Sequence, residues 1–492
     1  MKKYYSILFC CLLMTGFVAV SCSDNNEPDP CEVNPQPGCP NYVAIDPCDV
    51  NLTPDCPGYV DICESDPRPG CPNYVDPCET DPQPGCPNYV DPEAPVLSGT
   101  ITLGTVTYTV DSTYVEKVDD GLWYIYAQLK NEDKPLIIHS VRYATVTSGY
   151  SVETWIGEDL VTGKETPYDM VYRYEWAGRK VKVAINGGFY GVAAGGTAMG
   201  LELMNGLMSF PPDPDQPVIG FDAQNRPYMD YAIPNLKVKG ADNNEIDITS
   251  VNGTRWADWL VLYNSFKGSF TDTNEYGTEA LCKPMTGEWG KLDSYVNVPC
   301  KVEKIEIFPE EGVGIGNMEI PKGKFVLSGH GIARNFLNTW KEGDEVNVTQ
   351  DFTFKSDPTI TSATIRNAVS GLYDIILLNN TVVQPDISVI PPVDEGLVFS
   401  NHPRTSVGYT NQKDFIYFTI VEGRNPTTDN PTISAGVNYY ELGQVMKYLG
   451  AENAINLDGG GSSCLMIGKQ TMNFCTDGYQ RAVANGLAII KK

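Results

Sequence analysis

The chain has 492 residues, with 35 Lys or Arg and 62 Asp or Glu, and a formal net charge of −27. A charge this negative, with no visible basic patch, excludes nucleic acid as an expected partner and disfavours long-range attraction of anionic substrates. The length allows two or three domains.

Residues 1–22 have the pattern of a bacterial lipoprotein signal peptide. Two lysines precede an apolar run from Ile7 to Val20, and Cys22 follows this run. The pattern predicts export, with Cys22 as the lipidated first residue; an ordinary signal peptide is the alternative. The acidic residues after Cys22 resemble the export tags of surface lipoproteins in some Gram-negative bacteria. We therefore expect a lipid-anchored protein of the bacterial outer membrane, exposed at the cell surface.

Residues 23–97 form an acidic, Pro-rich segment that contains four copies of one short unit. Each copy has two cysteines eight residues apart with Pro-Gly-like turn chemistry between them, which predicts small disulfide loops in an exported protein. The units are too short to bury a core, and proline favours extended conformations, so we expect a stiff stalk. An Asp-rich calcium array is an alternative, although regular carboxylate spacing is missing. The expected pairs are Cys31–Cys39, Cys48–Cys56, Cys63–Cys71 and Cys78–Cys86.

Residues 98–492 predict one large domain of the α+β class, a β-rich mixed sheet with few helices. From Thr100 onward, β-branched and aromatic residues alternate with polar ones, as in half-buried strands. The clearest helix spans 438–449, where four apolar residues recur at helical spacing and Gly450 can end the helix.

Four cysteines lie in this domain, and three pairings of them are possible. A two-residue hairpin loop at 469–470 would place Cys464 opposite Cys475. We therefore expect the disulfides Cys464–Cys475 and Cys282–Cys300.

Residues 404–463 are expected to bring charged side chains to one sheet edge. Strands at 404–410 and 415–421 form a hairpin that places Arg404 beside Glu422. The helix and the strand that follow it form a crossover, so Asp458 reaches the same edge, where ligands commonly bind. Glu441, in the first turns of the helix, can face this edge too.

Two glycine-rich turns end apolar strands. Asn456-Leu-Asp-Gly-Gly-Gly-Ser462 can form a nest of N–H groups that binds an anion beside Asp458, or a tight turn with a capping Asp. Asn186-Gly187-Gly188 is either a second part of the site or a hairpin turn.

The ordered motifs resemble one known family. Asn186-Gly-Gly-Phe, Arg404-Thr405, Glu422-Gly423, Glu441-Leu442 and Asn456-Leu-Asp-Gly-Gly-Gly-Ser occur as in the phosphodiester glycosidases, whose animal member is the uncovering enzyme of lysosomal targeting. The resemblance covers most of 98–492 and none of the stalk. Position 422 is Glu where relatives often have Asp. The resemblance implies hydrolysis of the bond between an N-acetylglucosamine-like sugar and a phosphodiester, releasing free sugar and a phosphomonoester.

Residue roles follow from this resemblance. Arg404 is expected to neutralise the departing phosphate, and the carboxylate at the anomeric carbon is Asp458 first, Glu422 second and Glu441 third. The substrate-binding residues are expected to be Asn186, Gly187, Gly188, Thr405, Asn456, Gly459, Gly460, Gly461, Ser462, Asn264, His330 and Arg481.

No cofactor and no metal-ligand set are expected, although a divalent cation at Asp458 stays open as a variant. The competing hypothesis is a surface lipoprotein that binds a glycan without catalysis, so the partner is a sugar phosphodiester or a glycan in both cases. His139 is expected to be structural because it has no metal-ligand spacing. Trp256, Trp259 and Tyr263 are expected in the core rather than stacked on sugars.

Overall fold

The computed structural model describes Cys71 and residues 94–492, except 96, 98, 132–133, 192–194, 308–315, 374 and 425–433. The chain divides into two compact units, Met1–Asp91 and Pro92–Lys492. The predicted signal peptide, the lipidated Cys22 and the stalk with its loops lie outside the described residues, except that Cys71 is disulfide-bonded. Within the described part of the chain, no helix is long and apolar enough to span a membrane.

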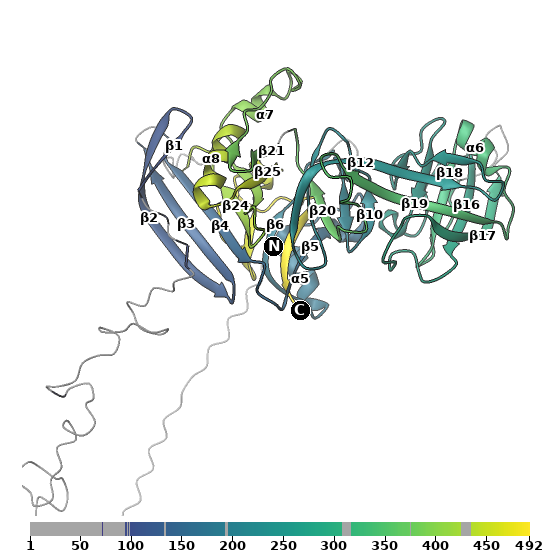
Figure 1. Ribbon diagram of the computed structural model, residues 1–492, viewed down its shortest axis with the longest axis horizontal. Helices are drawn as coiled ribbons and strands as arrows, with labels where there is room; N and C mark the ends of the chain where they lie inside the picture. The colour runs from purple at the N-terminus through teal and green to yellow at the C-terminus, as the bar shows by residue number, and fades with distance from the viewer. Residues whose placement is uncertain are drawn as a thin grey trace, which may run out of the picture. The chain divides into compact units, whose positions relative to one another are not determined.

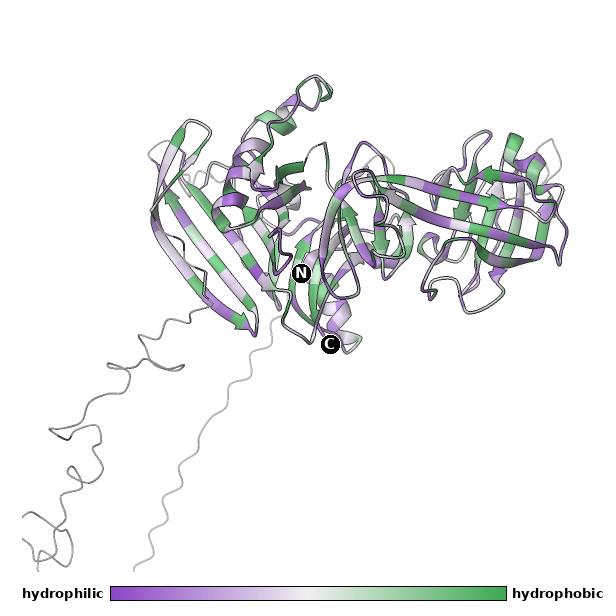
Figure 2. Cartoon of the chain, viewed as in Figure 1, coloured by the Kyte–Doolittle hydropathy of each residue, from purple (hydrophilic) through white to green (hydrophobic). Residues whose placement is uncertain are grey.

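The second unit contains a nine-stranded sheet in which every pairing is antiparallel (Figure 1). Hydrophobic and hydrophilic residues alternate along its first long strands (Figure 2), as expected for strands with one buried face. In spatial order the strands are β1 (Thr100–Leu103), β2 (Val106–Asp119), β3 (Leu122–Lys130), β4 (Leu136–Ala144), β24 (Phe415–Val421), β23 (Arg404–Tyr409), β25 (Asn453–Leu457), β21 (Ile375–Leu378) and β22 (Thr381–Val382).

A twelve-stranded sheet is formed by strands that lie between residues 202 and 370. Its path is β10 (Leu207–Phe210), β9 (Glu202–Met204), β20 (Asn367–Ser370), β11 (Pro217–Phe221), β12 (Pro227–Lys239), β19 (Glu345–Phe354), β17 (Val298–Ile307), β16 (Thr278–Pro284), β18 (Phe325–Gly329), β15 (Leu260–Tyr263) and β14 (Ser250–Val251), with β13 (Glu245–Asp247) paired to β12.

Two smaller sheets complete the strand content of the described residues. The five-stranded sheet runs β27 (Gln470–Thr471), β26 (Leu465–Ile467), β6 (Lys180–Asn186), β28 (Asn485–Lys491) and β5 (Tyr150–Ile156), and a hairpin joins β7 (Tyr190–Gly191) to β8 (Thr197–Ala198). The helices are α5 (Pro167–Trp176), α6 (Gly331–Leu337), α7 (Glu395–Phe399) and α8 (Tyr439–Leu449), with short 3₁₀ turns η1 (Gly157–Asp159), η2 (Ser265–Lys267) and η3 (Gly460–Ser462). The predicted β-rich α+β fold is confirmed.

Helix α8 matches the helix predicted over 438–449. The Asn438 side chain accepts the Glu441 N–H, and the Glu441 carboxylate accepts the Asn438 N–H, so a capping box starts the helix. Gly450 ends it with φ +102°, a conformation that favours glycine. Its apolar face packs on one side of the nine-stranded sheet. Strands β24 and β25 both run antiparallel to β23, so α8 joins two strands that run parallel, as predicted.

The opposite face of the nine-stranded sheet packs against the five-stranded sheet. Phe418 and Leu457 from the first sheet share one core cluster with Ile185 and Leu487 from the second. This contact brings the ends of β6, β23 and β25 together, although the strands are far apart in sequence.

The structure corrects the predicted Cys464–Cys475 disulfide, because both residues are free thiols. Strands β26 and β27 pair Ile467 with Gln470, so the turn comes one residue earlier than predicted and Cys464 falls opposite Asn473. The two thiols still interact by a hydrogen bond, which lowers the pKa of Cys475.

Cys282 and Cys300 are also free thiols. They lie on neighbouring strands, but Cys282 pairs with Val302 and Cys300 pairs with Pro284, so the two cysteines are diagonal neighbours. Each thiol donates to a carbonyl of its own strand instead. The predicted second disulfide is therefore corrected as well.

Candidate active site

Asn186 joins the two packed sheets at the edge where Asp458 lies. Its Oδ1 accepts from Thr405 Oγ1 at 2.9 Å and from the Cys464 N–H at 3.1 Å, and its Nδ2 donates to the Asp458 carbonyl at 2.6 Å. The side chain is fully buried. Asn186 therefore fixes the backbone of Asp458, and Thr405 fixes Asn186. The substrate contact expected of both residues stays a prediction.

Gly187 and Gly188 allow close packing at this edge. A Cβ on Gly187 would lie 2.1 Å from Asn485 Oδ1, and a Cβ on Gly188 would lie 2.2 Å from the Ser370 carbonyl. The Gly187 carbonyl also accepts the Asp458 N–H at 3.0 Å. These glycines bring β6 against its neighbours and hold Asp458 from a second side.

Asp458 lies just beyond the end of β25, and the residue as a whole is half-buried. Burial raises its pKa to about 6, while a hydrogen bond from Ser462 and the charge of Arg481 act in the opposite direction. Arg481 Nη1 lies 3.4 Å from Ser462 Oγ, and Arg481 also pairs with Asp477 at 2.7 Å. Burial raises the pKa of Tyr190 and the charge of Asp458 raises it further, so Tyr190 lies within electrostatic reach of Asp458. A carboxyl group with a pKa near 6 can serve as base, nucleophile or acid close to neutral pH.

Two arginines lie close to the glycine turn after Asp458. A Cβ on Gly461 would lie 2.2 Å from Arg481 Nη2, and a Cβ on Gly460 would lie 3.2 Å from Arg424 Nη1. Arg424 Nε in turn donates to His402 Nδ1 at 3.0 Å. Glycine at both positions therefore leaves room for Arg424 at Gly460 and for the Arg481–Asp477 ion pair at Gly461.

The predicted nest of N–H groups at residues 459–461 is partly used within the fold. The Gly460 N–H donates to the Pro403 carbonyl at 2.9 Å, and the Ser462 N–H donates to the Gly459 carbonyl at 3.1 Å. Positive charge for an anion at this turn therefore comes mainly from the arginine side chains.

Arg404 lies beneath the turn, where its guanidinium group holds the backbone. It is 1% exposed, and it donates to the carbonyls of Val437 (2.8 Å), Leu397 (2.7 Å) and Ser400 (2.9 Å). It also stacks on the Tyr439 ring at 4.8 Å. Burial lowers its pKa to about 10. Its predicted role as the phosphate ligand is less consistent with these contacts than a role for Arg481 and Arg424.

Glu422 is the last member of a buried hydrogen-bonded series that runs from Tyr124 through His139. Its Oε1 lies 2.8 Å from His139 Nε2 and accepts the Phe474 N–H at 2.7 Å. His139 Nδ1 lies 2.7 Å from Tyr124 Oη. His139 is thus structural in a specific sense, since it orients Glu422. Its position on β4 opposite Ile420 makes it a diagonal neighbour of Glu422, a relation that becomes visible only once β4 is paired with β24.

Glu441 and Asn456 make hydrogen bonds within the fold around α8. The Glu441 carboxylate accepts the Asn438 N–H at 3.1 Å, and it lies against Gly104 of the β1–β2 turn. Asn456 Nδ2 donates to Tyr439 Oη at 2.8 Å, and the side chain is fully buried. Neither position fits the catalytic or sugar-binding role expected for it.

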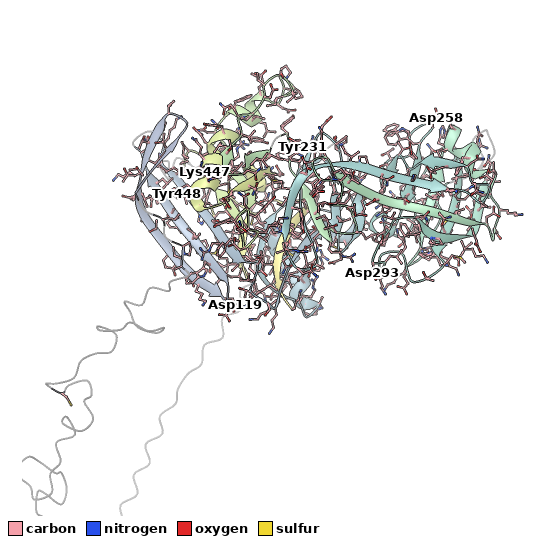
Figure 3. All side chains as sticks on the ribbon, in the orientation of Figure 1. Asp119, Tyr231, Asp258, Asp293, Lys447 and Tyr448 are labelled. Atoms are coloured by element: carbon pink, nitrogen blue, oxygen red, sulfur yellow. The ribbon has the colours of Figure 1, made fainter. Side chains whose placement is uncertain are left out.

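Asn264 and His330 lie in the part of the unit built on the twelve-stranded sheet. Asn264 is fully buried and bonds Asn252 and the Met208 carbonyl. His330 lies just before α6 and packs edge-on against Tyr276. In the first turn of α6, the Ile332 N–H donates to the Asp258 carboxylate. Figure 3 labels Asp258, in the loop between β14 and β15 of this sheet, and Lys447 on α8. These two predicted substrate residues are therefore not brought to Asp458.

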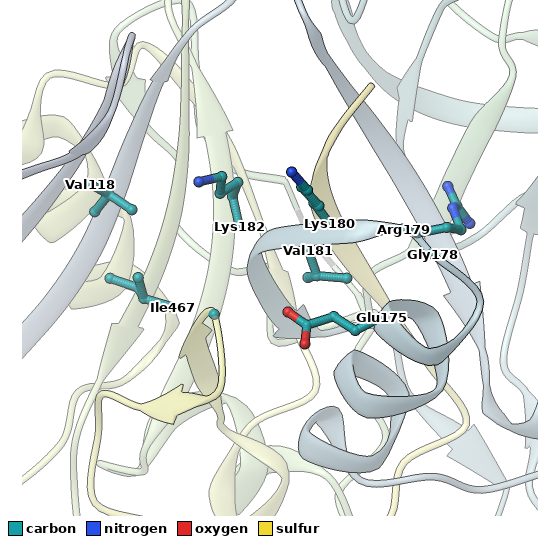
Figure 4. Close-up of a pocket in the computed structure, with 9 residues that line it drawn as sticks. Val118, Glu175, Gly178, Arg179, Lys180, Val181, Lys182 and Ile467 are labelled. Atoms are coloured by element: carbon teal, nitrogen blue, oxygen red, sulfur yellow. The ribbon is translucent and has the colours of Figure 1, made fainter.

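A cavity of about 620 Å³ lies between α5, β6 and the turn after β26 (Figure 4). Its cationic side chains are mostly paired, Lys182 with Asp119 at 2.7 Å and Arg179 with Glu153 at 2.5 Å. None of the groups around Asp458 lines it. Across the described ranges, no group of three or more His, Cys, Asp or Glu side chains could hold a metal ion.

Comparisons with solved structures show the fold. The chain is similar to the crystal structure of a hypothetical protein from Synechocystis (TM-score 0.59, 15% identity), covering 77% of this chain and 64% of that one. It is also similar to a protein from Burkholderia pseudomallei K96243 (TM-score 0.55, 18% identity), covering 72% of this chain and 74% of that one. The chain thus spans less than two thirds of the Synechocystis chain.

Sequence comparisons locate the family. No curated protein matches the chain. A zebrafish N-acetylglucosamine-1-phosphodiester alpha-N-acetylglucosaminidase catalytic domain, auto-inhibited by its pro-peptide, has a TM-score of 0.37 and 12% identity, over 78% of this chain and 89% of that domain. Residues 306–490, which include Glu422 and Asp458, match the phosphodiester glycosidase family, as the ordered motifs predicted.

Proposed function

We propose that this protein is a hydrolase that cleaves the glycosidic bond of a sugar-1-phosphodiester and releases free sugar and a phosphomonoester. The observation that carries the proposal is the arrangement at residues 458–462: a carboxyl group with a raised pKa beside a glycine turn that has two arginines close to it. The family match of residues 306–490 supports the same reaction class. An N-acetylglucosamine-like sugar, and a location at the cell surface through a lipid on Cys22, belong to this proposal.

The charges suit a phosphate leaving group. The leaving group is a phosphomonoester, which is a much weaker base than an alkoxide, so its departure needs charge neutralisation more than protonation. Arg481 and Arg424, which both lie close to the glycine turn, can supply this neutralisation. Arg404 acts from below by holding the 397–400 and 437 backbone in place.

The two carboxyl groups have different surroundings and therefore different roles. Asp458 is partly exposed next to the turn, so we assign it the contact with the anomeric carbon in its ionised form. Glu422 is buried and fixed by His139 and the Phe474 N–H, so we assign it the second carboxylate role, which is the activation of water.

The proposal is tested with an aryl phosphodiester of N-acetylglucosamine 1-phosphate as substrate. The wild-type chain should release free sugar, and Asp458→Asn should lose turnover by at least about 10³-fold while it still binds the substrate. Asp293→Asn is the matched control, since Asp293 is exposed in the loop between β16 and β17 (Figure 3). If the wild type binds the substrate but turns over none of it, the protein is a glycan-binding lipoprotein and not an enzyme.

A further inference from the structure

A second pocket, of about 340 Å³, lies in the part of the domain built on the twelve-stranded sheet. Its volume is within the range of small-molecule sites. Five threonines, two asparagines, a tyrosine, a glycine and three charged residues line it, and no aliphatic residue does so among the described residues. Such a lining offers many hydrogen-bond donors and acceptors, together with apolar surface from the threonine methyl groups and the tyrosine ring.

The loops that form the pocket are held by a buried polar network. Glu279 is fully buried and accepts from Thr271 Oγ1 (3.1 Å) and Thr273 Oγ1 (3.0 Å) of one loop. It also accepts from Ser328 Oγ at 2.8 Å, and Ser328 Oγ accepts from Arg255 Nη1 of the other loop at 2.8 Å. Burying Arg255 and Glu279 costs desolvation energy, and this cost is offset only because nearly every polar atom has a partner. The pocket walls are therefore pre-positioned.

Three exposed aromatic side chains are neighbours in the sequence of residues that line this pocket. Trp256 is 60% exposed, Phe270 is 43% exposed and Tyr276 is 42% exposed, and each is within two residues of a lining residue. The expectation that Trp256 packs in the core is wrong, whereas Tyr263 is buried and Trp259 packs against the same core cluster, as expected. Flat aromatic faces next to hydroxyl and amide groups match a ligand with one apolar face and a polar edge, such as a sugar ring.

The charges of the pocket are balanced by nearby ion pairs. Lys267 pairs with Asp272 at 3.5 Å, and Arg255 pairs at 4.0 Å with Glu279, which is buried and does not line the pocket. No charge is left over among these residues for an anionic ligand. The lining therefore favours a neutral ligand rich in hydroxyl groups.

We propose that this pocket binds a neutral saccharide, so that the protein holds a glycan at a second place besides the candidate active site. One hairpin connects the two places, because Thr197 of β8 lines the pocket while Tyr190 of β7, paired with Ala198, is within electrostatic reach of Asp458. This inference does not depend on catalysis, since it concerns binding alone.

The test is calorimetric titration of the full-length chain carrying Asp458→Asn with N-acetylchitotriose, maltotriose and mannotriose. At least one of the three should bind with a Kd of about 1 mM or tighter. Trp256→Ala and Thr254→Trp, which remove the aromatic face and fill the pocket, should each weaken binding at least tenfold. Trp176→Ala is the matched control, because Trp176 is 90% exposed on α5 and should leave binding unchanged.

Three outcomes would overturn the inference. None of the saccharides binds; binding survives both pocket variants unchanged, which would place the glycan elsewhere; or inorganic phosphate displaces the saccharide, which would make the pocket an anion site. Because the titration uses a variant that is inactive under the proposed function, a failure of turnover in the wild type leaves its reading unaffected.

Discussion

Replacing Asp458 with Asn should make the protein more stable at neutral pH while it abolishes turnover. The fold holds this carboxyl group where burial opposes ionisation, and the hydrogen bond from Ser462 and the charge of Arg481 compensate only in part. A neutral amide of the same size avoids the cost of burying a charge. A group kept for its chemistry is expected to carry such a cost.

The size and sign of the effect follow from the pKa. The pKa of Asp458 rises from its ordinary value of 3.8 to about 6, and this shift amounts to at most about 3 kcal/mol at pH 7.5. A raised carboxyl pKa means that the folded state binds the proton more tightly than the unfolded state does. The cost is therefore fully present above the folded pKa, falls to about 1 kcal/mol at pH 4.5, and disappears below the unfolded pKa.

Urea denaturation of wild type, Asp458→Asn and Asp293→Asn at pH 7.5 and pH 4.5 measures this difference. Asp458→Asn should raise the free energy of unfolding by up to about 3 kcal/mol at pH 7.5, and the gain should shrink by about two thirds at pH 4.5. Asp293→Asn should change it by less than about 0.5 kcal/mol at either pH. A destabilised Asp458→Asn variant, or a gain that does not depend on pH, would refute the reasoning.

Four further predictions concern the neighbours of this residue. The acidic limb of kcat/KM should have an apparent pKa near 6, because Asp458 acts ionised and its pKa is about 6; a limb near 4 would contradict this. His139→Phe should lower kcat by about tenfold or more and alter the pH profile, whereas His139→Gln, which can still donate to Glu422, should recover part of the rate; equal rates in both would remove His139 from the positioning of Glu422. Glu441→Ala should cost about 1 kcal/mol of stability through the lost capping box but keep kcat in the folded fraction, and loss of kcat would restore Glu441 as a catalytic candidate. Iodoacetamide should label Cys475 before Cys282 in peptide mapping, because a hydrogen bond lowers the pKa of Cys475 while burial raises that of Cys282; a 464–475 disulfide would contradict the free thiols.

The sequence predicts those elements whose start, buried face and end are all set by residues close together in the chain. The helix over 438–449 has its cap, its apolar face and its terminating glycine within twelve residues, and it formed as predicted. The hairpin pairing of Arg404 with Val421 followed from turn position, and it brought Glu422 and Asp458 to one edge.

The contacts that could not be predicted join a side chain to groups that are distant in the sequence. Arg404 has the charge for phosphate binding, but the carbonyls of Leu397, Ser400 and Val437 occupy it, and nothing in the local sequence shows where those carbonyls lie. The link from His139 to Glu422 crosses 283 positions and requires the β4–β24 register. A turn misplaced by one residue was enough to move Cys464 from Cys475 to Asn473.

The most direct test of the central claim is hydrolysis of the N-acetylglucosamine aryl phosphodiester in water labelled with ¹⁸O, followed by mass spectrometry of both products. Cleavage at the anomeric carbon, assisted by Asp458 with the phosphate held by Arg481 and Arg424, predicts that the label enters the free sugar and that the phosphomonoester carries none. Label found in the phosphomonoester would mean that the P–O bond breaks instead, and it would contradict the assignment of this site as a glycosidase.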